Sequence, residues 1–383
     1  MSFRPKGEPV MKSIKFIITT CCLLSFLALF AVNSNGCTGI MLKAKDNTVV
    51  YGRTMEWGAF DLNSRVAIVP RGYSFTGQTP DGFNGRQWKA KYGFVAIDVL
   101  EKDKFGDAMN EKGLAIGAFY QPGFASYMKY DKASVADTIS AVDLGAYVLG
   151  NFATVDEVAE GIKRVRVVGL AMEEMGGIEV PLHWMVVDRT GKSIVIEYLK
   201  GELQIFENPL GVITNSPEYH WHMTNLRNHV NLSAIALPAI KLEDIDFHPL
   251  GAGSGMIGLP GDNTPPSRFV RAVAWTQTAR PTETSTETIY ELLRILDNFN
   301  LPLGSAEGSG QANKMLEGMR SSTIWTSAWD LNKGILYYHT QHNRRVRMLR
   351  VTELDFAKNP HTIVHLPLDK EKVQDYEDIT PGR

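Results

Sequence analysis

The chain has 383 residues, 40 Lys and Arg against 42 Asp and Glu, a formal net charge of −2 and 44% hydrophobic residues. These values fit one large globular domain with a sizeable core and exclude a disordered or collagen-like chain. The balanced charge argues against a nucleic-acid-binding protein that relies on a broad basic surface. No repeat at the spacing of a solenoid or propeller occurs along the sequence.

The first segment of the chain has the pattern of a secretory signal peptide. Lys12 and Lys15 precede an apolar run over residues 16–32, and small polar residues follow it up to Gly36. A basic start, an apolar centre and a small-residue ending are the three parts of such a signal. The run also approaches the ~17–25 residues that span a bilayer, so an uncleaved anchor is the alternative interpretation.

We therefore expect residues 1–36 to be removed, with Met11 as an alternative start of the chain. The mature protein would then be exported, either to the bacterial periplasm or out of the cell, without a stable membrane anchor. A lipidated Cys37 is a weaker alternative, because a lipoprotein signal normally has an aliphatic residue where Ser34 stands.

Cleavage after Gly36 would make Cys37 the first residue and the only cysteine of the mature chain, since Cys21 and Cys22 lie in the signal. A thiolate is a strong nucleophile, and an α-amino group with a pKa near 7.7–8.0 is partly a free base at neutral pH. One residue then supplies both nucleophile and base, which is the principle of N-terminal nucleophile hydrolases. An inert buried cysteine is the structural alternative.

No metal or cofactor is expected from the sequence. The nine histidines show no metal-ligand spacing, and no cysteine follows Cys37. Residues 253–258 match the GxGxxG dinucleotide pattern, but no strand precedes them and Pro260 stops any following helix.

The residues after Cys37 predict a β-hairpin with a turn at Asp46-Asn47. A two-residue turn would place Glu56 opposite Cys37 and Arg53 opposite Ile40. A one-residue bulge would instead bring Arg53 to the face of the cysteine. In both registers a guanidinium and a carboxylate come near the thiol, and the arginine would favour the thiolate.

The rest of the chain predicts mixed helices and strands. Residues 183–206 form an antiparallel meander that resumes at Gly211 and ends at Asn215, where a strand end can present a side chain to a cleft. Thr154 and Glu157 form a capping box, Ser267 caps a helix to about Ala279, and the residues after Phe356 form a polar tail. The other expected helices are 136–152, 155–165 and 287–299, and the expected late strands are 323–329, 334–340 and 346–351.

Several long blocks resemble the choloylglycine hydrolase family in the order in which that family has them. They are CTGIMLKAKDNTVVYGRTMEW, DAMNEKGLAIGAFYQPGFASY, LHWMVVDRTGKSIVIEY, GVITNSPEYHWHMTNL and GMIGLPGDNTPPSRFVRA. The family contains conjugated bile acid hydrolases and penicillin V acylases. The resemblance covers roughly Cys37 to Tyr338 and implies an α+β fold, a four-layer αββα sandwich of two antiparallel sheets between helical layers. With the polar tail over 357–383 set apart, the hydrolase domain is expected over residues 37–356.

The resemblance also implies the role of six residues. Cys37 matches the nucleophile, Arg53 and Arg268 match two active-site arginines, and Asn215 matches the oxyanion-hole asparagine. Tyr120 aligns with the residue whose backbone N–H completes the oxyanion hole. Glu56 stands where aspartate is usual, and its extra methylene leaves the amine-orienting geometry open. The six candidate site residues are Cys37, Arg53, Glu56, Tyr120, Asn215 and Arg268.

The implied activity is hydrolysis of a linear amide through a Cys37 thioester, with glycine- or taurine-conjugated bile acids as the first substrate class. Penicillin V and N-acyl homoserine lactones are the alternative, which Tyr120 and Trp57 favour. A secreted binding protein that kept the fold without the chemistry is the alternative of another class. The expected partners are a small amide with an apolar acyl group and further copies of the chain, as a dimer or tetramer.

Overall fold

The structure is a computed structural model that describes residues 36–58, 61–173, 177–307 and 320–381. The expected signal peptide, with Cys21 and Cys22, lies outside the described residues. No helix among the described residues is long and apolar enough to cross a membrane.

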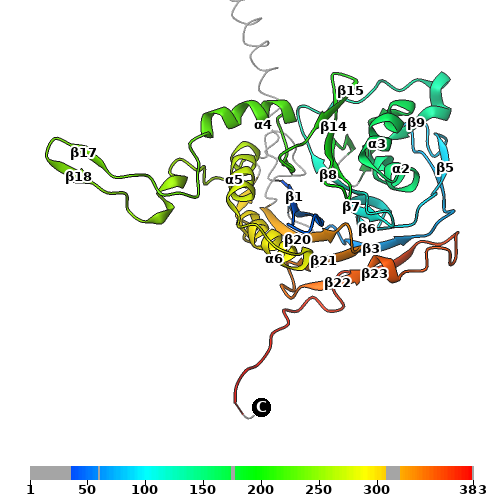
Figure 1. Ribbon diagram of the computed structural model, residues 1–383. Helices are drawn as coiled ribbons and strands as arrows, with labels where there is room; N and C mark the ends of the chain where they lie inside the picture. The colour runs from blue at the N-terminus through cyan, green and yellow to red at the C-terminus, as the bar shows by residue number, and fades with distance from the viewer. Residues whose placement is uncertain (1–35, 59–60, 174–176, 308–319, 382–383) are drawn as a thin grey trace, which may run out of the picture.

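Within the described residues, two antiparallel sheets form the centre of the molecule (Figure 1). Sheet A has the strand order β16–β1–β2–β20–β21–β22, and β19 also pairs with β20. Its strands are β1 (Thr38–Lys43), β2 (Val49–Gly58), β16 (Val212–Ile213), β19 (Ala306–Glu307), β20 (Arg320–Asp330), β21 (Ile335–Thr340) and β22 (Arg347–Arg350). The first described strand, β1, is therefore an interior strand, with β16 on one side and β2 on the other.

Sheet B has the order β15–β14–β13–β8–β7–β6–β3–β23. Its strands are β3 (Arg65–Val69), β6 (Phe94–Val99), β7 (Lys104–Asn110), β8 (Ala115–Tyr120), β13 (Leu182–Val187), β14 (Ser193–Leu199), β15 (Glu202–Glu207) and β23 (Val364–Pro367). Strand β23 lies within the expected polar tail and pairs with β3, so this part of the tail belongs to the sheet.

Helices cover the outer faces of the two sheets (Figure 1). Helices α5 (Pro265–Thr278) and α6 (Ser285–Leu296) pack on sheet A, and α2 (Leu144–Asn151) and α3 (Val155–Gly161) cover sheet B. Helix α4 (Tyr219–Asn225) follows β16 beside α5. This helix–sheet–sheet–helix order confirms the predicted four-layer α+β sandwich.

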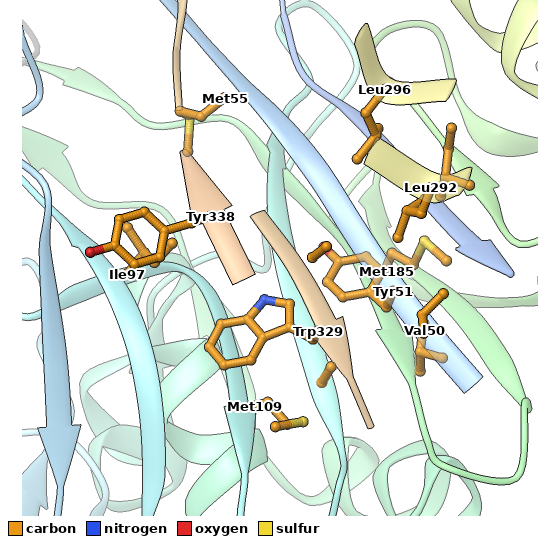
Figure 2. Packing of buried hydrophobic residues seen from close by; sticks show 14 of the residues in the cluster. Val50, Tyr51, Met55, Ile97, Met109, Met185, Leu292, Leu296, Trp329 and Tyr338 are labelled. Atoms are coloured by element: carbon orange, nitrogen blue, oxygen red, sulfur yellow. The ribbon is translucent and has the colours of Figure 1, made fainter. Parts of the chain in front are cut away.

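Alternating side chains of sheet B build two cores because both of its faces are covered. Met185 of β13 faces sheet A, whereas Trp184 beside it packs under α2 and α3. Figure 2 shows the core on the sheet A side, where Tyr51 and Trp329 meet Met185 and Leu292 of α6 packs from above. Strands β6 and β13 in this sheet therefore have apolar residues on both faces, as in FVAIDV and LHWMVV.

Short two-stranded units lie outside the main sheets. They are β4 (Ser74–Thr76) with β5 (Gln87–Lys89), β9 (Thr138–Ser140) with β10 (Arg166–Val168), β11 (Ala171–Met172) with β12 (Ile178–Glu179), and β17 (Ile240–Leu242) with β18 (Ile245–Phe247). The β17–β18 hairpin, residues 240–247, projects far from the body of the molecule and is called the arm below (Figure 1). The glycine-rich segment that follows the arm contains a short 3-10 helix, Ala252–Met256.

The structure decides between the two registers left open for the first hairpin. Arg53 pairs with Gly39 rather than with Ile40. The cause is a three-residue loop over 45–47, closed by a hydrogen bond from Ala44 N–H to Thr48 O at 2.9 Å, with Asn47 at a φ of 67°. Such a loop ends in a residue with a left-handed backbone conformation, which asparagine tolerates. Compared with a two-residue turn, it shifts the pairing of β1 with β2 by one residue. Arg53 therefore shares the face of Cys37, as in the second of the two registers considered.

Two predicted helices are present, but they begin at other residues than expected. The expected helix over 136–152 is an α-helix only from Leu144, because Thr138–Ser140 pair in parallel with β10. Ser267 does not cap α5. Thr264 is the N-cap residue and Pro265 occupies the first turn, where a missing N–H costs nothing.

Three further expectations can be compared with the structure. Thr154 accepts the N–H of Glu157 at 3.2 Å, as the capping box requires, although the Glu157 carboxylate takes the N–H of Ala153 instead of that of Thr154. The meander is confirmed over β13, β14 and β15, but β16 pairs with β1 in the other sheet. The three expected late strands correspond to β20, β21 and β22.

Candidate active site

Strand pairing places Cys37 at the centre of the candidate site. Gly39 pairs with Ile213 of β16, and continuing that register sets Cys37 opposite Asn215. The register with β2 sets Met55 on the other side of Cys37, and the two sulfur atoms lie 3.7 Å apart. The thiol is buried, with 4% of Cys37 exposed. A residue at the start of an interior strand is thus held from two sides.

Arg268 joins the nucleophile to the asparagine. Its Nη1 donates to Cys37 O at 2.7 Å and to Thr38 Oγ1 at 3.0 Å, and its Nη2 donates to Asn215 Oδ1 at 2.6 Å. Burial lowers the pKa of Arg268 to about 10, so the guanidinium remains charged at neutral pH. Because Oδ1 of Asn215 is taken by this cation, the side-chain Nδ2 must point the other way, as a donor.

The backbone of Tyr120 is oriented toward Asn215 by the pairing of β8 with β13. Gln121 N–H donates to Pro181 O at 2.7 Å, so Tyr120 and Leu182 form the adjacent pair without hydrogen bonds. The N–H and C=O of Tyr120 therefore point away from β13, where β7 no longer pairs with β8. Asn215 Nδ2 donates to Tyr120 O at 2.7 Å, which leaves its second N–H for another acceptor.

Arg53 crosses from sheet A to sheet B. Its Nη1 donates to Gly106 O at 2.8 Å and to Ala118 O, and its Nη2 lies 3.7 Å from Met55 Sδ. The guanidinium also lies over the Phe119 ring, 4.2 Å from the ring centre. A fully buried cation next to Cys37 is thus fixed in one orientation by carbonyls and an aromatic face.

Glu56 is held by hydroxyl groups at a β-bulge. The pairing of β2 with β20 shifts between Met55 and Glu56, and the Glu56 carboxylate accepts from Thr54 Oγ1 at 3.1 Å and from Thr323 Oγ1 at 2.8 Å. Thr54 Oγ1 also accepts the N–H of Thr38 at 3.3 Å, which links Glu56 to the residue after the nucleophile. Burial raises the pKa of Glu56, although Arg268 and the two threonines oppose that shift.

The charge balance around the thiol sets its ionisation. Burial is the largest effect and raises the pKa of Cys37, while the Arg53 guanidinium opposes this shift most strongly. The Glu56 carboxylate raises the same pKa, whereas its backbone N–H, hydrogen-bonded to the sulfur, lowers it. The thiol therefore needs a nearby base to become a nucleophile at neutral pH.

The nitrogen of Cys37 could act as that base only without Gly36, because with Gly36 attached it is a peptide nitrogen and cannot accept a proton. Gly36 is buried, and a Cβ at this position would lie 2.5 Å from Asn215 Oδ1. Since Arg268 and Tyr120 fix the Asn215 side chain, only glycine fits at position 36 in this arrangement.

An apolar pocket opens beside the thiol and encloses about 860 Å³, including space that is open to solvent. Trp57 and Tyr120 stand in its wall, with their rings edge to face at 5.8 Å. Glu56 and Lys104 are its charged lining residues, and the Lys104 ammonium donates to Asp143 at 2.8 Å. The pocket is also lined by Gly36, Cys37, Met55, Leu62, Val99, Leu100, Phe105, Gly106, Ala118, Ala141, Val142, Gly145, Met172, Val180, Leu182 and Trp184. Such a lining suits an apolar acyl group.

Asp98, Asp103 and His365 form a group of potential metal ligands within the described residues, away from Cys37. Arg65 Nη2 donates to Asp98 at 2.6 Å and lies 3.8 Å from Asp103. Its guanidinium already supplies the positive charge there, so this group is an ion-pair cluster rather than a metal centre.

The structure brings all six predicted site residues into one region. Asn215 and Arg268 contact each other and the Cys37–Thr38 segment, Tyr120 contacts Asn215, and Arg53 and Glu56 act on the thiol through their charge. Sequence reasoning missed Met55, His183, Glu197 and His222, which contact these residues or lie directly behind them. Glu197 had a signal, because it is a charged residue inside the apolar strand run SIVIEYL.

Comparisons with known proteins agree with this geometry. Residues 37–365 match the family described as linear amide C–N hydrolases, choloylglycine hydrolase family. The chain is 34% identical over 328 residues to the bile salt hydrolase/transferase of Clostridium perfringens, which covers 84% of this chain and 94% of that protein.

Two solved structures share the fold closely. A crystal structure of the conjugated bile acid hydrolase from Clostridium perfringens superposes with a TM-score of 0.77 at 30% identity, covering 90% of this chain and 100% of that one. The penicillin V acylase from Agrobacterium tumefaciens gives a TM-score of 0.70 at 26% identity, covering 87% and 92%.

Replacing Gly36 by leucine tests whether residue 36 must be small and must leave. We expect Gly36→Leu to retain the residues before Cys37 and to lose amide turnover, because its side chain would collide with Asn215 and Cys37 would lack a free amine. Intact-mass measurement of the N-terminus, with turnover assayed on the same sample, checks this. The matched control is a chain that begins at Cys37 after removal of the initiator methionine, which should be active. Full activity in a chain proven to retain residues before Cys37 would refute the requirement.

Proposed function

Because the chain belongs to the choloylglycine hydrolase family of linear amide C–N hydrolases, we propose that it deconjugates glycine- or taurine-linked bile acids through a thioester on Cys37. The observation that carries this proposal is the buried thiol between Asn215 and Met55, at the wall of an apolar pocket. The apolar body of a bile acid would occupy the pocket, with its amide carbonyl at the sulfur.

The proposed mechanism begins at the free N-terminus. The α-amine of Cys37 accepts the thiol proton while the sulfur attacks the amide carbon, and the carbonyl oxygen becomes an oxyanion. The protonated α-amine then gives its proton to the leaving nitrogen as the C–N bond breaks. Glycine or taurine departs and leaves an acyl thioester. Water attacks that thioester with the α-amine again as base, which releases the acid and restores the thiol.

The oxyanion is proposed to bind between Asn215 and Tyr120. Asn215 Nδ2 has one N–H engaged by Tyr120 O and one left over, and the backbone N–H of Tyr120 points to the same side of β8. Each such donor contributes roughly 2.7–4 kcal/mol to transition-state stabilisation in other hydrolases. Arg268 holds the asparagine in place, and the charge of Arg53 favours the thiolate.

Penicillin V or another small aromatic acyl amide is the second candidate substrate. The edge-to-face pair of Trp57 and Tyr120 in the pocket wall favours it, because a phenoxy ring can stack on aromatic side chains. N-acyl homoserine lactones would use the same apolar wall. A binding protein without chemistry is the remaining alternative, and it would bind these amides without forming a thioester.

Export is proposed together with this function. The apolar segment before Gly36 would direct the chain across the membrane, and its removal would expose the Cys37 amine. The same division would begin the catalytic domain at Cys37, and the domain extends beyond the expected end at 356 because β23 pairs with β3 in sheet B.

We also propose that the arm packs against a second copy of the chain. Ile240 pairs with Phe247 and Leu242 with Ile245, so all four side chains share one face, and each is about half exposed or more. Lys241 and Asp246 pair on the opposite face. A two-stranded ribbon is marginally stable alone, so an apolar face on such a ribbon needs a partner. The self-association expected from the family would supply it.

Substitution of the nucleophile tests the proposed reaction. Cys37→Ala should lose turnover of glycocholate, taurocholate and penicillin V, since no other cysteine follows it, and Cys37→Ser should retain at most a trace. Iodoacetamide should inactivate the wild type with one label per mature chain. Product formation is measured by liquid chromatography over this substrate panel, and the preferred acyl group decides between the two candidates. Undiminished hydrolysis by Cys37→Ala would refute the assignment.

The role of Asn215 is tested by removing its donor. Asn215→Ala should lower kcat by roughly 10²–10³ with little change in KM, because the lost hydrogen bond forms in the transition state. The rate is expressed per Cys37 thiol titrated with iodoacetamide, which corrects for misfolded protein. A normal kcat per titrated thiol would make Asn215 a structural residue only.

The oligomer proposal is tested by making the arm polar. Exchanging Ile240, Leu242, Ile245 and Phe247 for serine should shift the sedimentation coefficient of the protein toward that of a monomer. Tyr290→Ser is the matched control, because Tyr290 is an exposed aromatic residue on α6, 60% exposed and outside the arm. An unchanged sedimentation coefficient in the arm variant would exclude the arm as the contact.

A further inference from the structure

A buried acid–imidazole pair lies behind the proposed oxyanion site. Glu197 of β14 and His183 of β13 are opposite each other on the two strands, and Glu197 Oε1 lies 2.9 Å from His183 Nδ1. Their exposed fractions are 0% and 1%. The neighbouring residues of both strands face α2 and α3, so this pair faces sheet A, where β16 leads to Asn215.

Hydrogen bonds from the surrounding backbone and side chains hold both members of the pair in place. His183 Nε2 is 3.1 Å from Thr214 O, and a carbonyl oxygen only accepts, so Nε2 carries a hydrogen. Glu197 Oε1 already accepts from Gln121 Nε2 at 2.7 Å and from the Tyr219 N–H at 3.0 Å. His183 Nδ1 is the third nitrogen within hydrogen-bond distance of the same Glu197 oxygen. The pair is therefore held by Gln121, Tyr219 and Thr214 on its different sides.

This pair connects the two backbone segments that carry the oxyanion donors. Gln121, bound by Glu197, directly follows Tyr120, and Thr214, bound by His183, directly precedes Asn215. At the front of the site the same two segments meet through the hydrogen bond from Asn215 Nδ2 to Tyr120 O. Hydrogen bonds therefore connect the two segments on both sides: directly through Asn215 and Tyr120, and through Glu197 and His183 on the side away from the pocket.

A second imidazole holds the next carbonyl along the chain. His222 Nε2 lies 2.9 Å from Asn215 O, and its ring stacks on Phe269 at 4.7 Å. Burial lowers the pKa of His222 to about 4, so this ring is neutral and carries its hydrogen on Nε2. His183 and His222 therefore hold the two successive carbonyls of Thr214 and Asn215.

We propose that Glu197 and His183 are positioning residues that hold the Tyr120 N–H and the Asn215 amide at the separation an oxyanion requires. A buried pair of hydrogen-bonded polar groups often adds little stability over apolar side chains of the same volume, so the positions of its partners point to a geometric role. The Oε2 atom of Glu197 has no hydrogen-bond partner among the described residues, which also argues against a purely stabilising role. This inference rests on the proposed function, because it assigns the pair to that oxyanion site.

The test is Glu197→Gln in the mature enzyme. An uncharged amide cannot accept from all three donors, so one contact to His183, Gln121 or Tyr219 must fail. We expect kcat per titrated thiol to fall roughly 10- to 100-fold with KM within about threefold, since small displacements of catalytic groups cost rates of this order. The rate of Cys37 alkylation by iodoacetamide should stay unchanged, because alkylation forms no oxyanion. Glu197→Gln combined with His183→Gln should lose no more than the more damaging single change, since the pair acts as a unit.

Glu111→Gln is the matched control. Glu111 also accepts a backbone N–H, from Gly93 at 2.9 Å, and the guanidinium of Arg71, but it lies at the turn of β7 and β8 far from Tyr120. Its kcat should equal that of the wild type. If Glu197→Gln does not fold, Gln121→Met removes only the link to Tyr120 and should lower kcat in the same way.

Two results would overturn the inference. A kcat per titrated thiol within twofold of the wild type in Glu197→Gln, or in Gln121→Met where that variant replaces it, would make the network purely structural. A wild type that is alkylated normally but hydrolyses none of the amides would overturn the proposed function first, and this inference with it.

Discussion

The buried guanidinium of Arg268 is the interaction on which the site depends. It binds the carbonyl of Cys37, the hydroxyl of Thr38 and the side chain of Asn215 within one planar group. A guanidinium presents its donors in a rigid fork, so these three acceptors cannot move independently. Helix α5 supplies this group near its N-terminal end and packs on β1, so the helical layer over sheet A holds Cys37 and Asn215 at a fixed separation.

Strand order provides the rest of the geometry. Because β1 is an interior strand, the residue at its start has a neighbour on both sides: Asn215 beyond β16 and Met55 on β2. Sheet B contributes the carbonyls that accept hydrogen bonds from Arg53. It also contributes the backbone of Tyr120, whose carbonyl accepts from Asn215. Two buried arginines oppose the effect of burial and of the Glu56 carboxylate on the pKa of the thiol, and in the proposed mechanism the free amine of a Cys37 without Gly36 would supply the base.

The sequence predicted which residues lie together better than the contacts between them. A cysteine after a signal-like segment, with Arg53, Asn215 and Arg268 in family-like blocks, was enough to select residues that the structure brings into one region. The register of the first hairpin could not be predicted, because it depends on whether Asn47 adopts a left-handed conformation. That single residue decides whether Arg53 shares the face of the thiol.

Contacts between residues far apart in the sequence are the other feature that could not be predicted from the sequence. Residues 212–213 alternate like a fourth meander strand, yet they cross to sheet A, and only this crossing brings Asn215 to Cys37. The Glu197–His183 pair was missed for the same reason, since its two members are 14 residues apart and meet through strand register. Charged residues inside apolar strands are the sequence signal that would have drawn attention to it.

The central claim is that one residue, Cys37 with a free amine, carries both the nucleophile and the base. Rapid acid quenching during turnover of penicillin V or glycocholate, followed by peptide mass spectrometry, tests it most directly. The account predicts that the acyl mass appears on a peptide whose first residue is Cys37, as a thioester that hydroxylamine removes. An acyl group on any other residue, or on a Cys37 that still follows Gly36 during normal turnover, would contradict it.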